Sequence, residues 1–214
     1  MDGQAKTGRL IVFEGIDGTG KTTLAARLAA ALRADGHDAG LEVVETREPS
    51  RSAAGMQLRR LFAQKERTSS GAEELALFHE DRAEHVRFTV QPALARGAWV
   101  VQDRTFWSTA AYQGARGVPV AEILAKSRAI APLPDLTLLL TIEPEQALAR
   151  IHANRAGATS FEKLADLRDV ARVYAELARQ QPDFITLDAG RPLDAVMADV
   201  LVACRTRLGR PHAD

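Results

Sequence analysis

The stretch Gly15-Ile16-Asp17-Gly18-Thr19-Gly20-Lys21-Thr22 reads G-x-x-x-x-G-K-T and continues into Thr23. It lies between the apolar run 10–13 and an alanine-rich stretch that ends at residue 34. A strand, a glycine-containing turn and a helix in this order form a cradle for an oligophosphate. The backbone amides close round the phosphates, and the helix adds its positive N-terminal dipole. The alternative is a glycine-rich turn from strand to helix that binds no ligand.

Two side chains of this motif have specific expected roles. Lys21 is expected to reach the β- and γ-phosphates of the nucleotide, and the Thr22 hydroxyl to ligate Mg²⁺. The motif therefore predicts a nucleotide and a magnesium ion, but it does not separate a kinase from a GTPase or a motor.

The composition limits the partners that the chain can have. Its 214 residues are near the upper end for one compact domain, and 46% hydrophobic content is typical of a globular protein. Twenty-eight basic residues balance 28 acidic ones, so no overall field attracts nucleic acid or an anionic membrane. We expect one domain over residues 1–214, with no nucleic-acid or membrane partner.

The compartment is expected to be the cytoplasm. Residues 1–8 are polar and contain no apolar segment of signal-peptide length, and no stretch approaches the length that spans a bilayer. Cys204 is the one cysteine, so no internal disulfide can form, and we expect it to be a small core residue.

Apolar runs of strand length alternate with helical patterns, which predicts an α/β fold with a five-stranded parallel sheet and helices on both faces. The expected strands are 10–13, 41–46, 98–102, 136–142 and 184–187. The expected helices are 21–35, 55–64, 72–96, 107–115, 120–131, 144–154, 162–181 and 192–207.

Charged residues follow the first three expected strands, where ligands bind in such sheets. The first strand ends in Glu14, the second in Thr46-Arg47-Glu48-Pro49 and the third in Asp103-Arg104. The polar, glycine-containing segment 152–160 is expected to be a mobile loop between two helices.

Further motifs narrow the function. The N-K-x-D sequence by which GTPases read their base is absent. The chain instead has Phe78-His79-Glu80-Asp81-Arg82 and, after Asp103-Arg104, Ser108-Thr109-Ala110-Ala111-Tyr112-Gln113-Gly114. Together with Arg47-Glu48-Pro49, these motifs resemble thymidylate kinase in order and spacing, from about residue 9 to residue 201.

The resemblance implies a P-loop nucleoside-monophosphate kinase fold, a homodimer formed by packing helices, and phosphoryl transfer from Mg-ATP to dTMP. It implies that Asp17 bonds the 3′-hydroxyl of the sugar and that Arg47 and Arg104 hold the acceptor phosphate. Phe78 would stack on thymine, and Arg82 would bond its O4.

The same resemblance places other residues round the acceptor. Tyr112 would crowd the position of a ribose 2′-hydroxyl. Thr109 and Gln113 would complete the base and sugar pocket, with Ser108 in the same motif. Glu162 would contact the sugar or the magnesium ion.

The chemistry supports these roles independently. Two phosphates that approach for transfer repel each other, and guanidinium groups neutralise both while fixing their angle. A phosphate oxygen is already a nucleophile near pH 7, so no strong base is required. Asp103 is therefore interpreted as a ligand of magnesium-bound water or as a carboxylate that orients arginine.

A lid is expected at about residues 150–162. One subtype of the family has an arginine directly after the acidic residue of the phosphate loop, but this chain has Gly18 there. Arg150 and Arg155 match lid arginines of the other, bacterial subtype, which close over ATP. Arg191, in the loop after the last strand, is expected near the adenine, where a solvated arginine is the alternative.

The chain departs from the family pattern in three places. Ser50-Arg51-Ser52 replaces the frequent Gly-Gly-Thr, Thr105 replaces an aromatic residue or histidine, and Thr159-Ser160 replaces an Asp-Arg pair of the lid. The last change brings lid closure into question.

Simpler interpretations compete with several of these roles. Arg82 could belong to a solvated salt-bridge face with Glu80, Asp81 and Glu84, and Phe78 could be a core residue. Arg47 could be in a local loop ion pair, Tyr112 an ordinary packing aromatic, and the lid arginines solvated charges. The alternative functions are another nucleotide or deoxynucleoside kinase, and a nucleotide-binding regulatory protein with weak activity.

Overall fold

The computed structural model describes residues 8–34, 41–64, 69–154, 164–181 and 183–209. Within these ranges five parallel strands form one sheet in the order β2-β3-β1-β4-β5. Their bounds are β1 Arg9–Glu14, β2 Val43–Arg47, β3 Trp99–Asp103, β4 Leu136–Thr141 and β5 Phe184–Asp188. The predicted five-stranded parallel sheet is confirmed, and the strand ends differ from the prediction by at most two residues.

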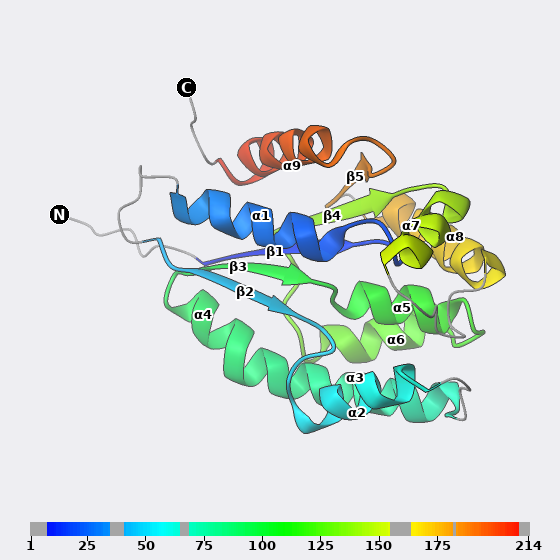
Figure 1. The fold of residues 1–214 in the computed structure, drawn as a ribbon. Helices are drawn as coiled ribbons and strands as arrows, with labels where there is room; N and C mark the ends of the chain where they lie inside the picture. Colours follow the sequence, from blue (N-terminus) through cyan, green and yellow to red (C-terminus); the bar gives the residue numbers. More distant parts are fainter. Residues whose placement is uncertain (1–7, 35–40, 65–68, 155–163, 182, 210–214) are drawn as a thin grey trace.

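Helices cover both faces of this sheet, as predicted. Figure 1 shows α1 and α9 above the strands, α5, α6 and the long helix through α3 and α4 below them, and α7 and α8 beyond the ends of β1 and β4. The bounds are α1 Lys21–Ala34, α2 Ala53–Phe62, α3 Gly71–His85, η1 Val86–Val90, α4 Gln91–Ala95, α5 Phe106–Gly114, α6 Val120–Arg128, α7 Pro144–Asn154, α8 Leu164–Gln180 and α9 Leu193–Leu208.

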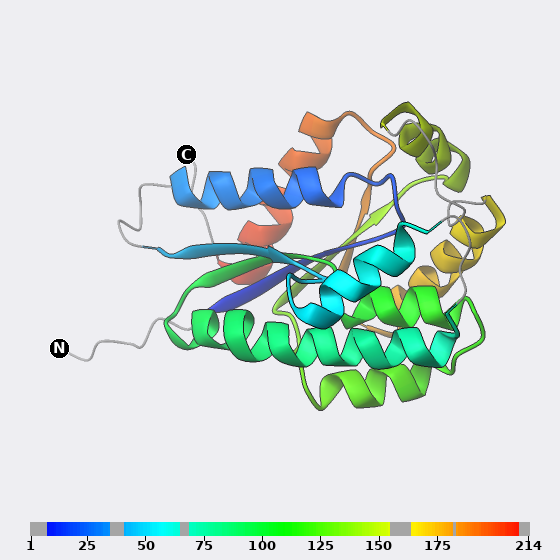
Figure 2. The same cartoon turned by 60° about the horizontal axis from the view of Figure 1, so that its bottom comes forward.

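The long helix that was predicted as one unit contains a π-helical turn. It begins at a capping box in which Ser70 and Glu73 satisfy each other's backbone N–H groups. The π turn η1 is followed by Pro92, which has no N–H to donate to the preceding turn. Figure 2 shows that α3, η1 and α4 still form one continuous rod, with α2 crossing beside it.

Alternating side chains of the central strands pack on opposite faces. Ile11 and Phe13 of β1 pack with α1 and α9, whereas Leu10 and Val12 pack with η1 and α4. All four are buried, as expected of a strand covered on both sides. Cys204 lies in the cluster beneath α9, and its predicted role as a core residue is confirmed.

The strand order positions the functional site. The chain passes from β1 through α1 to β2, beyond β3, and later from β3 through α5 and α6 to β4, beyond β1. These two crossovers leave the neighbouring strands β1 and β3 in opposite directions, which leaves a crevice at their carboxyl ends. Phe13 lies opposite Asp103 in this register, and Arg47 lies opposite Asp103 on the other side. The charged ends of the first three strands therefore meet at one edge of the sheet.

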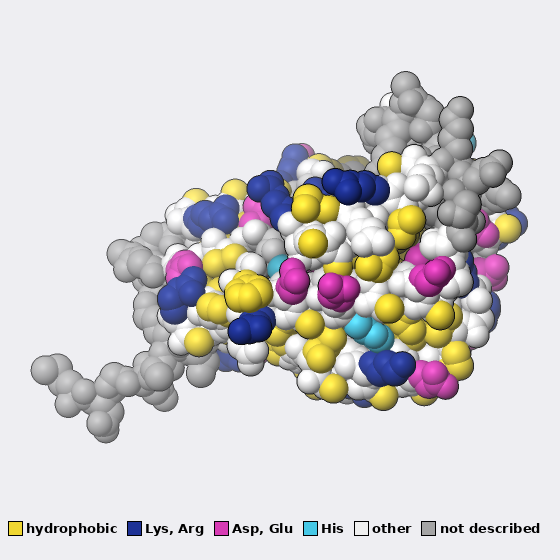
Figure 3. Space-filling view, turned by 90° about the horizontal axis from the view of Figure 1, so that it is seen from below, with side chains coloured by type: hydrophobic (Ala, Val, Ile, Leu, Met, Phe, Trp, Pro, Cys, Tyr) yellow, Lys and Arg dark blue, Asp and Glu magenta, His cyan; other side chains and the backbone are white. Residues whose placement is uncertain are grey.

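The surface mixes charges of both signs. Figure 3 shows, on the side where α2, α3 and α6 lie, acidic and basic side chains interspersed with apolar ones. Among the helices that the structure describes, none combines the length and the apolar character needed to cross a lipid bilayer.

Candidate active site

A cavity of about 1070 Å³ lies at the carboxyl ends of the strands. The phosphate loop, the ends of β2 and β3, and residues of α2, α3, α5, α7 and α8 form its walls. Most of the predicted site residues line it: Asp17, Gly18, Thr19, Gly20, Lys21, Thr22, Thr23, Arg47, Phe78, Asp103, Arg104, Ser108, Thr109, Tyr112, Gln113, Arg150 and Arg191.

The remaining predicted residues lie elsewhere. Gly15, Ile16 and Arg82 are buried next to the cavity and are not part of its lining. Arg155 and Glu162, and with them most of the expected lid and the 152–160 loop, lie outside the described residues.

Glycine is required at two positions of the phosphate loop. Gly15 and Gly18 have φ values of 138° and 84°, in the region that side chains rarely adopt. A Cβ atom at Gly18 would lie 2.5 Å from the carbonyl oxygen of Ala147 in α7. An arginine therefore does not fit at position 18 without movement of α7.

Lys21 is buried at the start of α1. Its Nζ donates to the Ile16 carbonyl at 2.7 Å and contacts Thr19 Oγ1 at 3.3 Å. Burial, and then the nearby charge of Arg104, lower the pKa of Lys21 to about 8. The ammonium group thus lies in the loop without a full counter-charge, which the phosphates of a nucleotide would supply.

Thr22 and Asp103 fit a magnesium site. The Thr22 hydroxyl donates to Asp103 Oδ2 at 2.6 Å, and Asp103 Oδ1 is buried with no hydrogen-bond partner among the described residues. No group of three or more His, Cys, Asp and Glu side chains in the described ranges forms a metal cage. Mg²⁺ ordinarily takes one or two protein oxygens and completes its shell with water and phosphates, so this donor set suits it.

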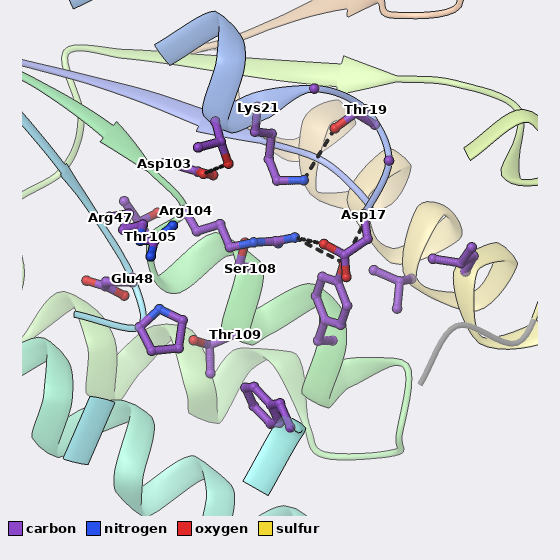
Figure 4. A pocket seen from close by; sticks show the side chains of 18 of the residues that line it. Asp17, Thr19, Lys21, Arg47, Glu48, Asp103, Arg104, Thr105, Ser108 and Thr109 are labelled. Carbon is purple, nitrogen blue, oxygen red and sulfur yellow. Dashed lines mark hydrogen bonds and ion pairs between the residues drawn. The ribbon is translucent and has the colours of Figure 1, made fainter. Parts of the chain in front are cut away.

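Arg104 spans the crevice between the two halves of the cavity. Its backbone has a φ of 70°, and its Nη2 donates to Asp17 Oδ1 at 2.6 Å. Its Nη1 donates to Ser108 Oγ at 2.9 Å, and its guanidinium carbon lies 5.1 Å from the centre of the Tyr112 ring. Figure 4 shows Arg104 extending to Asp17, with Lys21 and Thr19 on one side of it and Glu48 and Thr109 on the other.

Asp17 and Tyr112 are joined as well. The Tyr112 hydroxyl accepts from the Asp17 N–H at 3.1 Å and donates to Asp17 Oδ2 at 3.2 Å. Burial raises the pKa of Tyr112, so the phenol stays neutral at physiological pH. Tyr112 is therefore more than a packing aromatic, because it ties α5 to the phosphate loop.

Arg82 forms a buried ion pair beneath the acceptor half. Its Nε and Nη2 donate to Glu48 Oε2 at 3.1 and 2.7 Å, and the side chains are 1% and 5% exposed. Burial disfavours the charged carboxylate, but Arg82, and then His85, lower the pKa of Glu48 below its ordinary value. The alternative of a solvated salt-bridge face is wrong for Arg82, because the guanidinium points inward from α3 to β2.

One N–H of Arg82 remains available. A guanidinium carries five N–H groups. Nε–H and one Nη2–H face Glu48, the other Nη2–H donates to Thr109 Oγ1 at 2.8 Å, and one Nη1–H faces Ser127 Oγ at 3.4 Å. The second Nη1–H has no hydrogen-bond partner among the described residues, and Thr109, which holds the same guanidinium, lines the cavity.

The aromatic wall comes from two helices. Phe78 of α3 is partly buried and lines the cavity, with its ring centre 5.9 Å from that of Phe62 in α2. A residue wholly inside the core would not reach this surface. Gln113 lines the same wall but donates to the buried Glu74 at 2.9 Å.

Sequence reasoning missed Arg59. It extends from α2 into the cavity and bonds the backbone carbonyls of Pro49 and Ser50. Burial, and then the charge of Arg47, lower the pKa of Arg59. An arginine in a polar helix resembles a solvated charge, so only the arrangement of α2 beside the β2 end shows its place.

The alternative of a solvated face is wrong for Asp81 as well. It is fully buried and accepts from the Ser50 N–H and from the hydroxyls of Ser50 and Ser52. The Ser50-Arg51-Ser52 departure is therefore a loop anchored to α3. Asp166 and Asp169 of α8 line the cavity too, and the sequence analysis did not single them out.

Two arginines lie on the side where the last strand ends. Arg150 Nη1 donates to the Ala189 carbonyl at 2.8 Å, which joins α7 to the loop after β5. Arg191 lines the cavity while its guanidinium pairs with Asp199. Both arginines line the cavity on the side of the loop after β5.

Comparisons with known proteins agree with this geometry. The family model described as thymidylate kinase matches residues 13–200. A thymidylate kinase of Xanthomonas campestris is 42% identical over 97% of this chain and 90% of its own length, and one of Akkermansia muciniphila is 42% identical over 94% of each. A probable thymidylate kinase of Archaeoglobus fulgidus is 41% identical over 89% of this chain and 92% of its own length. The chain therefore belongs to the thymidylate kinase family and has its P-loop nucleoside-monophosphate kinase fold.

Proposed function

We propose that this chain transfers the γ-phosphoryl group of ATP to dTMP, giving dTDP and ADP, within one domain. The observation that carries the proposal is Arg82, which Glu48 and the cavity-lining Thr109 hold beneath the cavity and which has one N–H without a partner among the described residues. The names of the relatives support the same acceptor.

ATP binds on the phosphate loop, residues 15–23. The loop amides and Lys21 hold the β- and γ-phosphates, and Arg191 lies beside the adenine. Thr22 and Asp103 hold the magnesium ion, since their oxygens lie together and one Asp103 oxygen has no other partner in the described chain. When bound, Mg²⁺ neutralises charge on the phosphates during transfer.

The acceptor phosphate lies between Arg47 and Arg104, with Arg59 behind them. Phosphate competes with Asp17 for the Arg104 guanidinium, which leaves the Asp17 carboxylate able to bond the 3′-hydroxyl of the sugar. These groups fix the angle of approach and neutralise the repulsion between the two nucleotides, so positioning supplies much of the rate.

The base is read by a buried polar pair. Arg82 donates to O4 of thymine, and Thr109, whose oxygen has a second lone pair, accepts from N3–H. Phe78 stacks on the ring, and Ser108 and Gln113 complete the pocket. Tyr112 occupies the space that a 2′-hydroxyl needs, because its hydroxyl is fixed on Asp17.

The segment from 150 to 162 acts as the lid in this proposal. Arg155 meets the charge that develops on the transferred phosphoryl group, Arg150 joins the donor side, and Glu162 contacts the sugar or the ion. The close approach of α7 to Gly18 supports a cation from outside the loop.

A deoxynucleoside kinase is the main alternative, and the carboxylates argue against it. A 5′-hydroxyl acceptor needs a general base. Of the cavity-lining carboxylates on the phosphate loop and at the strand ends, Glu48 is bound to Arg82, Asp17 to Arg104, and Asp103 to Thr22, whereas Asp166 and Asp169 lie apart from them on α8. A coupled assay of ADP formation tests this point: dTMP should give one ADP for each dTDP, and thymidine none. ADP formation with thymidine at a rate near that with dTMP would overturn the proposal.

The chain is proposed to work as a cytoplasmic homodimer. Phe88 of η1 and Met56 of α2 are 68% and 47% exposed, which leaves apolar surface for helix packing between copies. Light scattering after gel filtration should give twice the chain mass, and a monomer at micromolar concentration would contradict it.

A further inference from the structure

Glu14 is a fully buried carboxylate beneath the crevice, at the last residue of β1. Its Oε1 accepts from the Thr105 N–H at 2.7 Å and from the Thr105 hydroxyl at 2.9 Å. Its Oε2 accepts from Ser108 Oγ at 2.6 Å and from the Tyr174 hydroxyl at 2.8 Å. The carboxylate thus joins β1, the β3–α5 loop, α5 and α8.

The burial of the Glu14 carboxylate carries a desolvation cost. Burial raises the pKa of Glu14 above its ordinary value, although its hydrogen bonds and the charge of Arg104 oppose this effect. A buried carboxylate persists only where hydrogen bonds and nearby cations compensate its desolvation. The β3–α5 loop, α5 and α8, which Glu14 joins to β1, also carry residues that line the cavity, so the position of Glu14 bears on the reaction.

The contacts of Glu14 converge on Arg104 from two directions. Ser108 Oγ accepts from Arg104 Nη1 and donates to Glu14, so the chain of donors runs from the guanidinium to the carboxylate. Glu14 also holds the backbone of Thr105, the next residue after Arg104. Arg104 itself has a left-handed φ of 70°, which a non-glycine residue keeps only when its surroundings enforce it.

We propose that Glu14 is a positioning residue that fixes the backbone and the guanidinium of Arg104 toward the acceptor phosphate. Tyr174 extends this network to α8, the helix that follows the lid segment. The proposal rests on the role of Arg104 given above.

A merely structural role predicts a different pattern of binding. Arg104 contacts only the phosphate of dTMP, so its misplacement weakens binding of dTMP and leaves thymidine unaffected. A general loosening of the pocket weakens both ligands alike. The ratio of the dissociation constants of thymidine and dTMP, measured by calorimetry, separates the two roles.

In Glu14→Gln we expect the amide to present its NH₂ to Ser108 and Tyr174, so that Ser108 loses the acceptor of its own proton and no longer holds Arg104 Nη1 in place. The Kd for dTMP should rise about tenfold and that for thymidine less than twofold, so the ratio falls about tenfold. Asp135→Asn is the matched control, because Asp135 accepts from the Leu10 N–H and from Arg9 at the opposite end of β1. The ratio should stay unchanged there.

Two further variants keep the test decisive. Tyr174→Phe removes one donor to the same carboxylate and should lower the ratio about threefold, even if Glu14→Gln does not fold. In an Arg104→Ala background, Glu14→Gln should have no further effect on the ratio. An equal loss for both ligands, or an unchanged ratio in Glu14→Gln and Tyr174→Phe, would overturn the proposal. If Arg104→Ala leaves the ratio of the two dissociation constants unchanged, Arg104 does not bind the phosphate of dTMP, and the proposal for Glu14 fails with it. The formation of dTDP tests the proposed reaction independently of this result.

Discussion

The donor and acceptor halves of the cavity are built in opposite ways. The donor half is one contiguous loop, residues 15–23, whose binding groups are backbone amides and one lysine. The acceptor half is made of side chains from β2, α3 and α5, in which Arg82 bonds Glu48 and Thr109, 34 and 27 positions away in the chain.

This difference divides the work of the site. Backbone amides at a helix N-terminus bind any oligophosphate, so the donor half gives affinity without reading a base. The buried ion pair of the acceptor half fixes donors and acceptors before the substrate arrives, so this half can select. Variants of the donor half should therefore lose turnover, whereas variants of the acceptor half should lose stability or selectivity.

The largest effect is expected from Lys21→Ala. Removal of this phosphate clamp from a buried site should lower kcat by about 10³-fold, while the fold is retained. A coupled ADP assay measures the rate, and Lys126→Ala, at an exposed position of α6, is the control that should remain within about twofold of the wild type. Near-normal turnover in Lys21→Ala would show that the loop is not the donor site.

On the acceptor side, Glu48→Gln should lower the stability of the fold as well as the activity. It leaves the Arg82 guanidinium buried without its counter-charge, which costs about 3 kcal/mol in the free energy of unfolding. Urea denaturation measures this loss. Glu42→Gln breaks the exposed pair with Arg96 and should leave the free energy of unfolding nearly unchanged, because water already screens both charges. Equal losses in the two variants would contradict the buried pair.

A smaller change is expected in sugar selectivity. Tyr112→Ala opens the space beside the sugar, so the preference for dTMP over ribothymidine monophosphate should fall about tenfold in kcat/KM. Tyr112→Phe keeps the ring and should keep the preference. If the Ala variant discriminates as well as the Phe variant, another residue excludes the 2′-hydroxyl.

The smallest effect is a dependence on pH. The folded pKa of Glu48 is lowered, so its contribution to stability is complete above the ordinary carboxyl pKa and is lost as the pH falls below it. The stability difference between the wild type and Glu48→Gln should be constant from pH 7 to pH 5 and narrow on further acidification. A stability difference that widens toward low pH would show that the pKa of Glu48 is raised, not lowered, in the folded protein.

The sequence predicted the strand, loop and helix around the phosphate loop well because this information is local. The strand, the glycines and Lys21 follow one another, and the structure places them as expected. Arg47, Arg104 and Tyr112 were placed through the family resemblance, since they lie far apart in the chain.

The acceptor half was harder to predict because charge on a helix is ambiguous. Arg82 and Asp81 resemble members of a solvated face, and only the tertiary fold shows that both point inward. Arg59 and the buried network of Glu14 gave no sequence signal, because their partners come from elements that pair only in the folded sheet. The π turn at 86–90 is also invisible to a helical periodicity of 3.6 residues.

The central claim is that the acceptor half reads a keto base, and the ratio of kcat/KM for dTMP and dCMP tests it most directly. Cytosine presents an amino group to the Arg82 N–H, and its N3 carries no hydrogen, so Thr109 would have to turn its hydroxyl to donate to N3. The buried Arg82 N–H would face a second donor and stay unpaired, so dTMP should be preferred by about 10³-fold or more at saturating Mg-ATP. A dCMP reaction within about tenfold of the dTMP reaction would contradict the account.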